Sequence, residues 1–397
     1  MHRPATRTRL KTSGTSAPAK SLPQKYFVSP NIFVKEQAEI FSKEWLLVGH
    51  QSQLPDAGDY FVQQVIGESL IVIRDKGGEI HGFFNVCRHR GTRLKEDAYG
   101  HASAIQCPYH AWTYGLDGRL IGAPHMDEVP GFDKADYSLQ PVNLGVWEGF
   151  IFVNLKNGGT RLRSEATARQ APGDFISLER WFAPLNGKFA DWNMAILRPA
   201  KRIEYDVRAN WKLMFENYSE CYHCPGVHPM LSKISPYDSA ENDLAEGPFL
   251  GGFMKINPGK SLSMSGNACA LPIEHDQEHD KESTQRVFYY SIFPNMLLSM
   301  HPEYVMVHQL WPQSPERTLI VCDWFFHPDA FSRKDFNPKD AIEFWDMTNK
   351  QDWHVCELSQ QGIASRAYKP GPYSSRERIP AAWDEYYLRS MEREARS

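Results

Sequence analysis

The sequence predicts an α+β fold with two domains, an antiparallel β domain followed by a domain of mixed strands and helices. Three observations support this prediction. Short strand-like runs divided by turn residues fill 56–160, longer helix-like and strand-like segments fill 161–397, and an Asn-Gly-Gly stretch at 157–159 separates them. The chain has 397 residues, 42% of them hydrophobic, which is enough for a core in each domain.

Residues 1–25 carry six basic side chains and no acidic ones, and few large apolar residues. We therefore predict a disordered basic tail. An Arg-rich start is also compatible with an organelle transit peptide, but no amphipathic period accompanies it, so we expect a cytoplasmic protein. The net charge of −4 gives no reason to expect nucleic-acid binding. No apolar run approaches the roughly 20 residues that cross a bilayer, so no membrane association is expected.

Residues 26–55 are predicted to form a helical segment that begins at Ser29, includes Trp45 and packs on the second domain. The β domain is expected to have strands at 60–65, 69–74, 81–86, 111–114, 119–121 and 146–155. In the second domain we expect helices at 175–182, 211–222, 338–365 and 381–394, and strands at 197–207, 287–291, 296–300, 304–310 and 318–326.

Two short loops of the β domain combine cysteine with histidine. Cys87 and His89 form a C-x-H motif, and Cys107 and His110 form a C-x₂-H motif 17 residues further on. These four ligands could hold a tetrahedral zinc ion, or a [2Fe-2S] cluster with both cysteines on one iron and both histidines on the other. The interleaved order favours the cluster, because each loop then supplies one ligand to each iron. Five further cysteines are expected to be reduced thiols.

These loops, with Trp112 and the Gly-Leu-Asp-Gly turn at 115–118, resemble those of the Rieske family. The resemblance implies a Rieske [2Fe-2S] cluster as a cofactor.

A second motif lies in the mixed domain, where Glu216, Glu220, His223 and His228 are spaced E-x₃-E-x₂-H-x₄-H. On one helix the first three would share a face. A helix break at Pro225-Gly226 would then bring His228 back beside His223. The alternative is a core histidine beside solvated glutamates. A zinc knuckle formed by Cys221 and Cys224 is less favoured, because on a helix the two side chains would point in different directions.

Together with the Rieske loops, this segment resembles the mononuclear iron motif of Rieske non-haem iron oxygenases. The resemblance implies a catalytic domain of helix-grip type, with an antiparallel sheet flanked by helices. It also implies Fe(II) bound by His223, His228 and a carboxylate from a later helix. Asp352 is chosen because D-x₃-C-E-x₂-Q at 352–360 matches the family's pattern, and Asp346 and Glu357 are the fallback ligands.

Glu220 stands where most of the family has an aspartate that bridges the cluster histidine of a neighbouring subunit to an iron-binding histidine. The resemblance therefore implies a catalytic role for Glu220 and a homotrimer. It places a glutamate here among members that oxidise carnitine, glycine betaine or stachydrine.

The predicted function is the terminal oxygenase of a Rieske system that uses O₂ to mono-oxygenate a quaternary ammonium substrate, by N-demethylation or hydroxylation. No flavin, nicotinamide or plant-type ferredoxin motif is present, so a separate NAD(P)H-dependent reductase of flavin or ferredoxin type is expected to supply electrons. Aromatic-ring hydroxylation is the alternative, and a Rieske electron carrier without oxygenase activity is a remote one. Aromatic residues that could form a cation-π cage include Phe249, Phe253, Tyr289, Tyr304 and Trp311, although aromatic residues on strands more often belong to the core.

Overall fold

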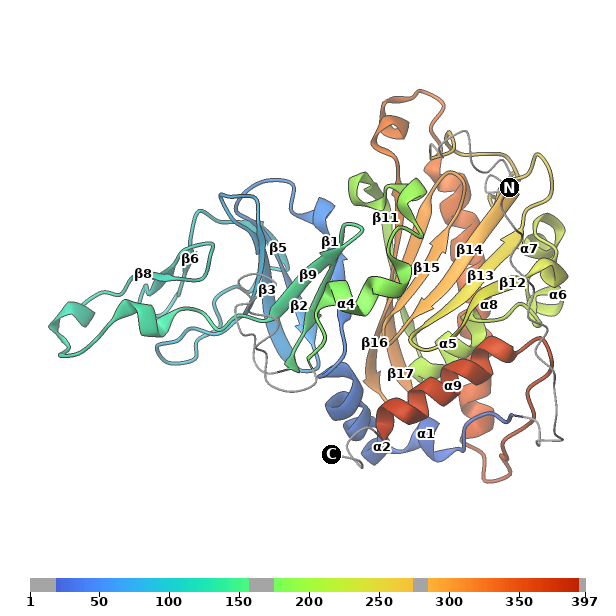
Figure 1. Ribbon diagram of the computed structural model, residues 1–397, viewed down its shortest axis with the longest axis horizontal. Helices are drawn as coiled ribbons and strands as arrows, with labels where there is room; N and C mark the ends of the chain where they lie inside the picture. The colour runs from blue at the N-terminus through green and yellow to red at the C-terminus, as the bar shows by residue number, and fades with distance from the viewer. Residues whose placement is uncertain (1–18, 157–174, 274–284, 393–397) are drawn as a thin grey trace, which may run out of the picture.

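The structure, a computed structural model, describes residues 19–156, 175–273 and 285–392, which form two lobes (Figure 1). All four sheets are antiparallel, and helices pack on the largest, so the predicted α+β fold is confirmed. The predicted domain boundary at 160 lies outside the described residues.

The smaller lobe contains two sheets around one core. The first has the strand order β4-β3-β2-β5, and the second has the order β6-β7-β8. Their bounds are β2 (Asp59–Val65), β3 (Glu68–Arg74), β4 (Ile80–Phe84), β5 (Tyr99–His101), β6 (Ile105–Gln106), β7 (Thr113–Tyr114) and β8 (Leu120–Gly122). The core of this lobe includes Cys87, Cys107, Trp112 and Tyr114, so the metal-binding motif is built around its hydrophobic centre.

A third sheet lies between the lobes, with the order β1-β10-β9. Its strands are β1 (Leu46–His50), β9 (Asn143–Trp147) and β10 (Phe150–Asn154). The prediction of one strand over 146–155 was wrong. Glu148 and Gly149 both have positive φ, 49° and 83°, and form the tight turn that folds this stretch into a hairpin.

The larger lobe is built on a seven-stranded sheet of order β11-β17-β16-β15-β14-β13-β12. The strands are β11 (Arg198–Val207), β12 (Glu241–Glu246), β13 (Phe249–Lys255), β14 (Arg286–Ile292), β15 (Met296–Met300), β16 (Val305–Ser314) and β17 (Arg317–Phe326). Five of these match predicted strands, and β12 and β13 were not predicted. β12 is exposed and polar, so it has no apolar alternation that a sequence pattern can detect.

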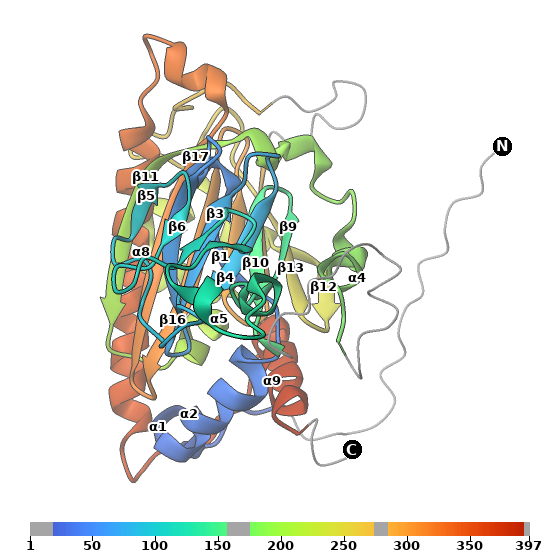
Figure 2. The ribbon, with the colours of Figure 1, turned by 90° about the vertical axis from the view of Figure 1, so that its left-hand side faces the viewer.

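Both faces of this sheet are covered (Figures 1 and 2). The helices on one face are α5 (Trp211–Tyr218), α8 (Pro338–Ile363) and α9 (Arg378–Met391), while the small sheet and α4 (Leu178–Phe182) pack on the other. Consecutive residues of β15 therefore pack in different cores. Leu297 packs on the side of the helices, and Leu298 packs on the opposite side. The Asn295 amide binds both the backbone N–H and the carbonyl of Leu47, which ties the small sheet to the large one.

The N-terminal segment packs against the helices of the larger lobe. It consists of α1 (Lys25–Val28), α2 (Pro30–Glu36) and one turn of π-helix (Gln37–Phe41), so the helix ends before Trp45. The buried Glu36 accepts hydrogen bonds from Lys212 of α5 and Tyr387 of α9. Burying a charge without partners is costly, so this arrangement holds α2 against both helices.

Part of the predicted tail is folded. Residues 1–18 lie outside the described residues, but Leu22 is buried and Gln24 donates hydrogen bonds to the carbonyls of Ile363 and Ser365. The prediction of disorder through residue 25 was therefore wrong for 19–25. Leu22 packs in the hydrophobic core of the larger lobe. The composition of the segment does not indicate this contact.

Candidate functional site

The four predicted cluster ligands come together on two loops, one after β4 and one after β6. The thiols of Cys87 and Cys107 are buried and neither forms a disulfide, while the rings of His89 and His110 lie side by side with centroids 4.8 Å apart. Burial raises the pKa of the Cys87 thiol. The two cysteines lie together and the two histidines lie together. This arrangement suits a two-iron cluster in which the cysteines bind one iron and the histidines bind the other.

Neighbouring side chains hold these ligands in place. The Trp112 ring stacks on His89 at 4.8 Å with an interplanar angle of 8°. The Tyr114 hydroxyl lies 3.3 Å from the Cys87 sulfur and accepts a hydrogen bond from the backbone N–H of Arg88, so its own proton is free to point at the sulfur. Hydrogen bonds to cluster sulfurs are one of the levers that set the reduction potential of such centres.

Two observations test whether these residues fit a cluster. Nδ1 of His110 is buried and has no hydrogen-bond partner in the described part of the chain, as expected of a nitrogen that binds a metal. A single ion would need at least three donor atoms close together. Within the described ranges, such groups are found elsewhere and not among these four residues. The arrangement therefore fits a two-iron cluster better than zinc.

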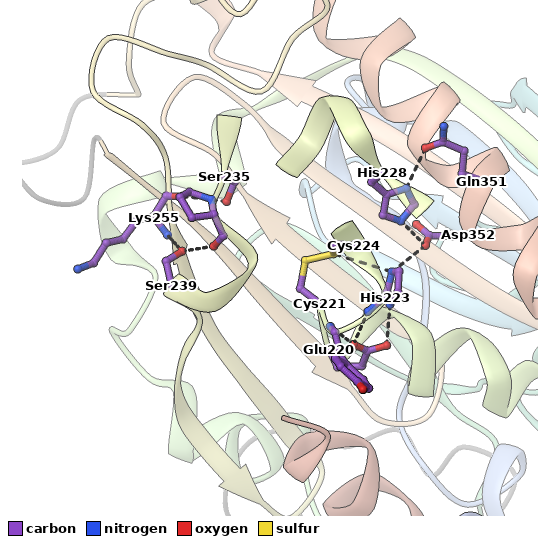
Figure 3. The surroundings of a disulfide bond; sticks show 12 residues. Glu220, Cys221, His223, Cys224, His228, Ser235, Ser239, Lys255, Gln351 and Asp352 are labelled. Atoms are coloured by element: carbon purple, nitrogen blue, oxygen red, sulfur yellow. Dashed lines mark hydrogen bonds and ion pairs between the residues drawn. A yellow bond between two sulfur atoms is a disulfide. The ribbon is translucent and has the colours of Figure 1, made fainter. Parts of the chain in front are cut away.

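The second motif produces a compact triad of donors (Figure 3). Donor atoms of His223, His228 and Asp352 all lie within 4.8 Å of one another. Asp352 Oδ1 is 2.8 Å from Nε2 of His228 and 3.3 Å from Nε2 of His223. Two histidines and one carboxylate are the set that holds non-haem Fe(II) with open positions, so these residues fit such an ion.

Each histidine is oriented by a hydrogen bond from its other ring nitrogen. Nδ1 of His223 lies 2.6 Å from Oε1 of Glu220, and Nδ1 of His228 lies 2.8 Å from Oε1 of Gln351. Both acceptors select the tautomer with the proton on Nδ1, which leaves the lone pair of each Nε2 directed at the triad. Figure 3 shows both rings held in this way.

The electrostatics of the triad suit a cation. Burial lowers the pKa of His223, but hydrogen bonds to Asp352 and Glu220 outweigh it and raise the pKa to about 10. Burial acts to raise the pKa of Asp352, and the two histidines lower it. The two carboxylates thus favour a positive charge at the triad, either a proton on His223 or a bound cation, and Asp352 stays ionised.

The local backbone differs from the prediction. The helix expected over 211–222 ends at Tyr218, and the carboxylate of Glu220 accepts hydrogen bonds from the backbone N–H groups of Tyr222 and His223. A side-chain acceptor of this kind competes with the helical hydrogen bonds and ends the helix. Pro225 then lies in the first turn of α6 (Cys224–Val227), so it begins a helix and does not break one.

Three carboxylates considered at the sequence level lie away from the triad. Glu216 is half-buried with its Oε1 atom enclosed, and desolvation together with Asp384 raises the pKa of Glu216 well above its ordinary value. The fallback ligand Asp346 accepts from the Tyr205 hydroxyl and pairs with Lys350. Glu357 accepts from the backbone N–H of Arg208. Neither fallback ligand joins the triad.

Cys221 and Cys224 form a disulfide, so the prediction that these two thiols are reduced and point apart was wrong (Figure 3). Because the helix ends at Tyr218, the chain curls between the two residues and brings their Cα atoms to 5.0 Å. Cys269, Cys322 and Cys356 are free thiols, as predicted.

The triad lies in the wall of a cavity of about 280 Å³. Of the residues predicted to form a cage, Phe253 and Tyr289 line this cavity. Phe249, Tyr304 and Trp311 belong to the hydrophobic cores. The lining residues that the sequence analysis missed include Tyr218, Trp345, Trp353 and His308. Burial lowers the pKa of His308 to about 4, so this ring is neutral.

Family comparisons agree with this geometry. Residues 44–133 match the Rieske [2Fe-2S] domain, and residues 194–393 match the ring hydroxylating alpha subunit (catalytic domain). The chain belongs to the Rieske oxygenase family. Its cofactors are therefore a Rieske [2Fe-2S] cluster and a mononuclear iron, and it is an oxidoreductase whose electrons come from a reductase partner.

The similarity to other proteins extends over most of the chain. The glycine betaine monooxygenase oxygenase subunit of Chromohalobacter salexigens is 32% identical, over 89% of this chain and 82% of its own length. The carnitine monooxygenase oxygenase subunit of Acinetobacter baumannii is 30% identical, over 88% and 87%. The structure of the quaternary ammonium Rieske monooxygenase CntA in complex with L-carnitine matches with a TM-score of 0.69 and 27% identity, covering 94% of this chain and 96% of that one.

Across the described ranges, no helix is both long and apolar enough to cross a bilayer.

Proposed function

We propose that this Rieske oxygenase mono-oxygenates a quaternary ammonium substrate of betaine type, by N-demethylation or by hydroxylation beside the nitrogen. The observation that carries the proposal is the triad of His223, His228 and Asp352 in the wall of a cavity with aromatic lining. The similar proteins named for glycine betaine and carnitine oxidation support the substrate class.

The cavity suits a compact onium group. Aromatic faces attract quaternary ammonium ions through their negative π-electron density. The aromatic side chains that line the cavity include Tyr218, Tyr289, Trp345 and Trp353, and the Tyr218 and Tyr289 rings pack edge to face with centroids 5.9 Å apart. The two tyrosine rings can contact a trimethylammonium group directly. They do not present a charged hydrogen-bond acceptor to it.

Each residue of the site has a separate task. We assign His223, His228 and Asp352 to the Fe(II), and Cys87, His89, Cys107 and His110 to the [2Fe-2S] cluster. When bound, the cluster supplies single electrons and the iron supplies the position at which O₂ is activated. Glu220 and Gln351 hold the two histidine rings, and the buried aromatic lining limits the access of water to the reacting methyl group.

We propose that electrons cross between subunits of a homotrimer, through Glu220. Figure 1 places β6, next to the cluster loops, near one end of the chain and α6, next to the triad, near the opposite end. This separation does not favour electron transfer within one chain. Glu220 is half-buried, and its carboxylate accepts from Nδ1 of His223 through Oε1 and from the backbone N–H groups of Tyr222 and His223 through Oε2. A histidine of a second copy would therefore donate to a remaining lone pair of this carboxylate.

We further propose an NAD(P)H-dependent reductase of flavin or ferredoxin type as the electron donor, and the cytoplasm as the compartment. Support comes from the absence of nucleotide-binding and plant-type ferredoxin motifs in the sequence, and from the supply of NAD(P)H in that compartment.

Oxygen uptake by the holoenzyme with a generic reductase tests the function. Glycine betaine, carnitine and stachydrine would be compared with benzoate-type aromatic acids, with formaldehyde measured as the product of N-demethylation. We expect uptake to be stimulated by one or more of the quaternary ammonium compounds. Stimulation by aromatic acids alone would overturn the proposal in favour of ring hydroxylation.

A further inference from the structure

The charged side chains that line the cavity fall into two groups. The carboxylates, Glu220 and Asp352, are already bound to histidines of the triad. The permanently charged residues that remain are Arg376 and Arg378, and both line the cavity while being exposed to solvent. These two arginines therefore mark a place where the cavity opens, between the start of α9 and the strand β12, whose Asn242 is also an exposed lining residue.

Local contacts fix this segment. The carboxylate of Glu377 accepts a hydrogen bond from the backbone N–H of Ser374, and the Ser374 hydroxyl accepts one from the backbone N–H of Arg376. The guanidinium of Arg376 lies over the ring of Tyr237, 5.1 Å from its centroid, and Tyr237 itself lines the cavity. Glu377 lies between the two arginines in sequence but is not a lining residue.

Among the described residues, no ion pair neutralises either guanidinium. In the described residues, no carboxylate forms an ion pair with Arg376 or Arg378, although other exposed arginines such as Arg317 and Arg389 do form such pairs. Two unpaired cations at the mouth of a cavity repel a bare cationic ligand. They suit a ligand that carries its own negative charge at the end facing solvent.

We propose that Arg376 and Arg378 bind the substrate carboxylate at the cavity mouth, so that the enzyme selects zwitterionic betaines over quaternary ammonium cations without a carboxylate. This inference rests on the proposed function and names the substrate class more narrowly. Guanidinium groups pair with carboxylates through short, charge-assisted hydrogen bonds. The onium end then lies deeper, among the aromatic rings near the triad.

The test compares Arg376→Gln, Arg378→Gln and the double variant with the wild-type holoenzyme, using glycine betaine and choline, which differ in having a carboxylate or a hydroxyl. We expect each single variant to raise KM for glycine betaine about 10- to 100-fold, because a charge-assisted bond is lost. KM for choline should stay unchanged or fall. The matched control is Arg389→Gln, which removes an arginine of the same helix that is paired with Glu385 and does not line the cavity.

The outcomes distinguish failure of the arginine assignment from failure of the proposed function. If the wild type oxidises glycine betaine but the arginine variants keep its KM, the arginine assignment is wrong and the proposed function stands. Preference of the wild type for choline over glycine betaine would also overturn the assignment. If the wild type neither binds nor oxidises any quaternary ammonium compound, the proposed function fails and the assignment fails with it. The cluster absorbance verifies that each variant is folded.

Discussion

The two candidate metal centres are built in opposite ways. The cluster residues lie on loops that follow short strands, β4 of five residues and β6 of two, with buried thiols on one side and the exposed His89 on the other. The triad is enclosed instead. Its donors come from a turn, the start of α7 (Pro229–Ile234) and the middle of the long helix α8, and each histidine has its own hydrogen-bond acceptor.

This difference follows from what each centre has to exchange. An electron can pass through an imidazole ring at the surface, so an electron store works best with a ligand that a partner can approach. Oxygen chemistry needs a defined ligand geometry and a cavity with little water, so its ligands are held by second interactions. Single substitutions can remove, one at a time, the features in which the two centres differ.

The largest effect is expected from removing Asp352, because the triad has a carboxylate ligand and the cluster has none. Asp352→Ala should lower the iron content from about three to about two per chain and abolish product formation, because the triad loses its anionic ligand and the cluster keeps both its irons. Iron analysis and the cluster absorbance measure the two centres separately. Asp346→Asn, on the same helix, is the matched control and should keep about three irons. Retention of three irons by Asp352→Ala would contradict the ligand assignment.

The connection between the centres is tested at Glu220. Glu220→Ala should reduce turnover about 100-fold while the cluster remains reducible, since no carboxylate then links the two imidazoles. Glu220→Gln keeps one acceptor, because its amide oxygen still accepts from His223, whereas its NH₂ group can accept neither from a second histidine nor from the backbone N–H groups of Tyr222 and His223. We expect Glu220→Gln to bind iron normally and to reoxidise its reduced cluster slowly when mixed with substrate and O₂. Normal turnover in both variants would refute the bridging role.

Most of the proposed metal ligands could be predicted because each group is defined by a short-range spacing in the sequence. Cys87 and His89, Cys107 and His110, and the pair His223 and His228 each lie within a few residues of one another. The structure brings each group together. Asp352 lies 124 positions from His228 and could be selected only because its own helix carries a family pattern.

The rest depended on contacts that no local pattern contains. The end of α5 was missed because helix propensity favoured continuation, whereas the Glu220 carboxylate binds the backbone beyond it. Trp345, Trp353 and His308 reach the cavity from α8 and β16, and only the pairing of strands with distant helices shows which aromatic residues line it. Gln351 could not be distinguished from any other polar residue of a long helix.

The role of the outer hydrogen bonds is tested at Gln351. Gln351→Leu removes the acceptor 2.8 Å from Nδ1 of His228 and should weaken iron binding about 10- to 100-fold. The cluster should be unaffected, because the change lies in the other lobe. Titration of the metal-free catalytic site with Fe(II) measures the effect, and Gln361→Leu, an exposed position on the same helix, is the control. Equal affinities in the two variants would show that Gln351 does not orient His228.

The smallest effect is expected at the cluster. Tyr114→Phe removes the hydroxyl that lies 3.3 Å from the Cys87 sulfur. A hydrogen bond from this hydroxyl stabilises the reduced cluster more than the oxidised one, because the reduced cluster is more negative. The reduction potential should fall by up to roughly 130 mV, from about 1.5–3 kcal/mol for a hydrogen bond to a charged group and 59 mV per tenfold change for one electron. A spectroelectrochemical titration measures this, with the exposed Tyr109→Phe as control. An unchanged potential would show that the hydroxyl does not donate to the sulfur.

The presence of two distinct iron centres in one chain is tested most directly by metal and acid-labile sulfide analysis of the purified, reconstituted holoprotein. The account predicts about three irons and about two sulfides per chain, two irons in the cluster and one at the triad. Two irons with two sulfides would describe an electron carrier. Zinc without sulfide would contradict both centres at once.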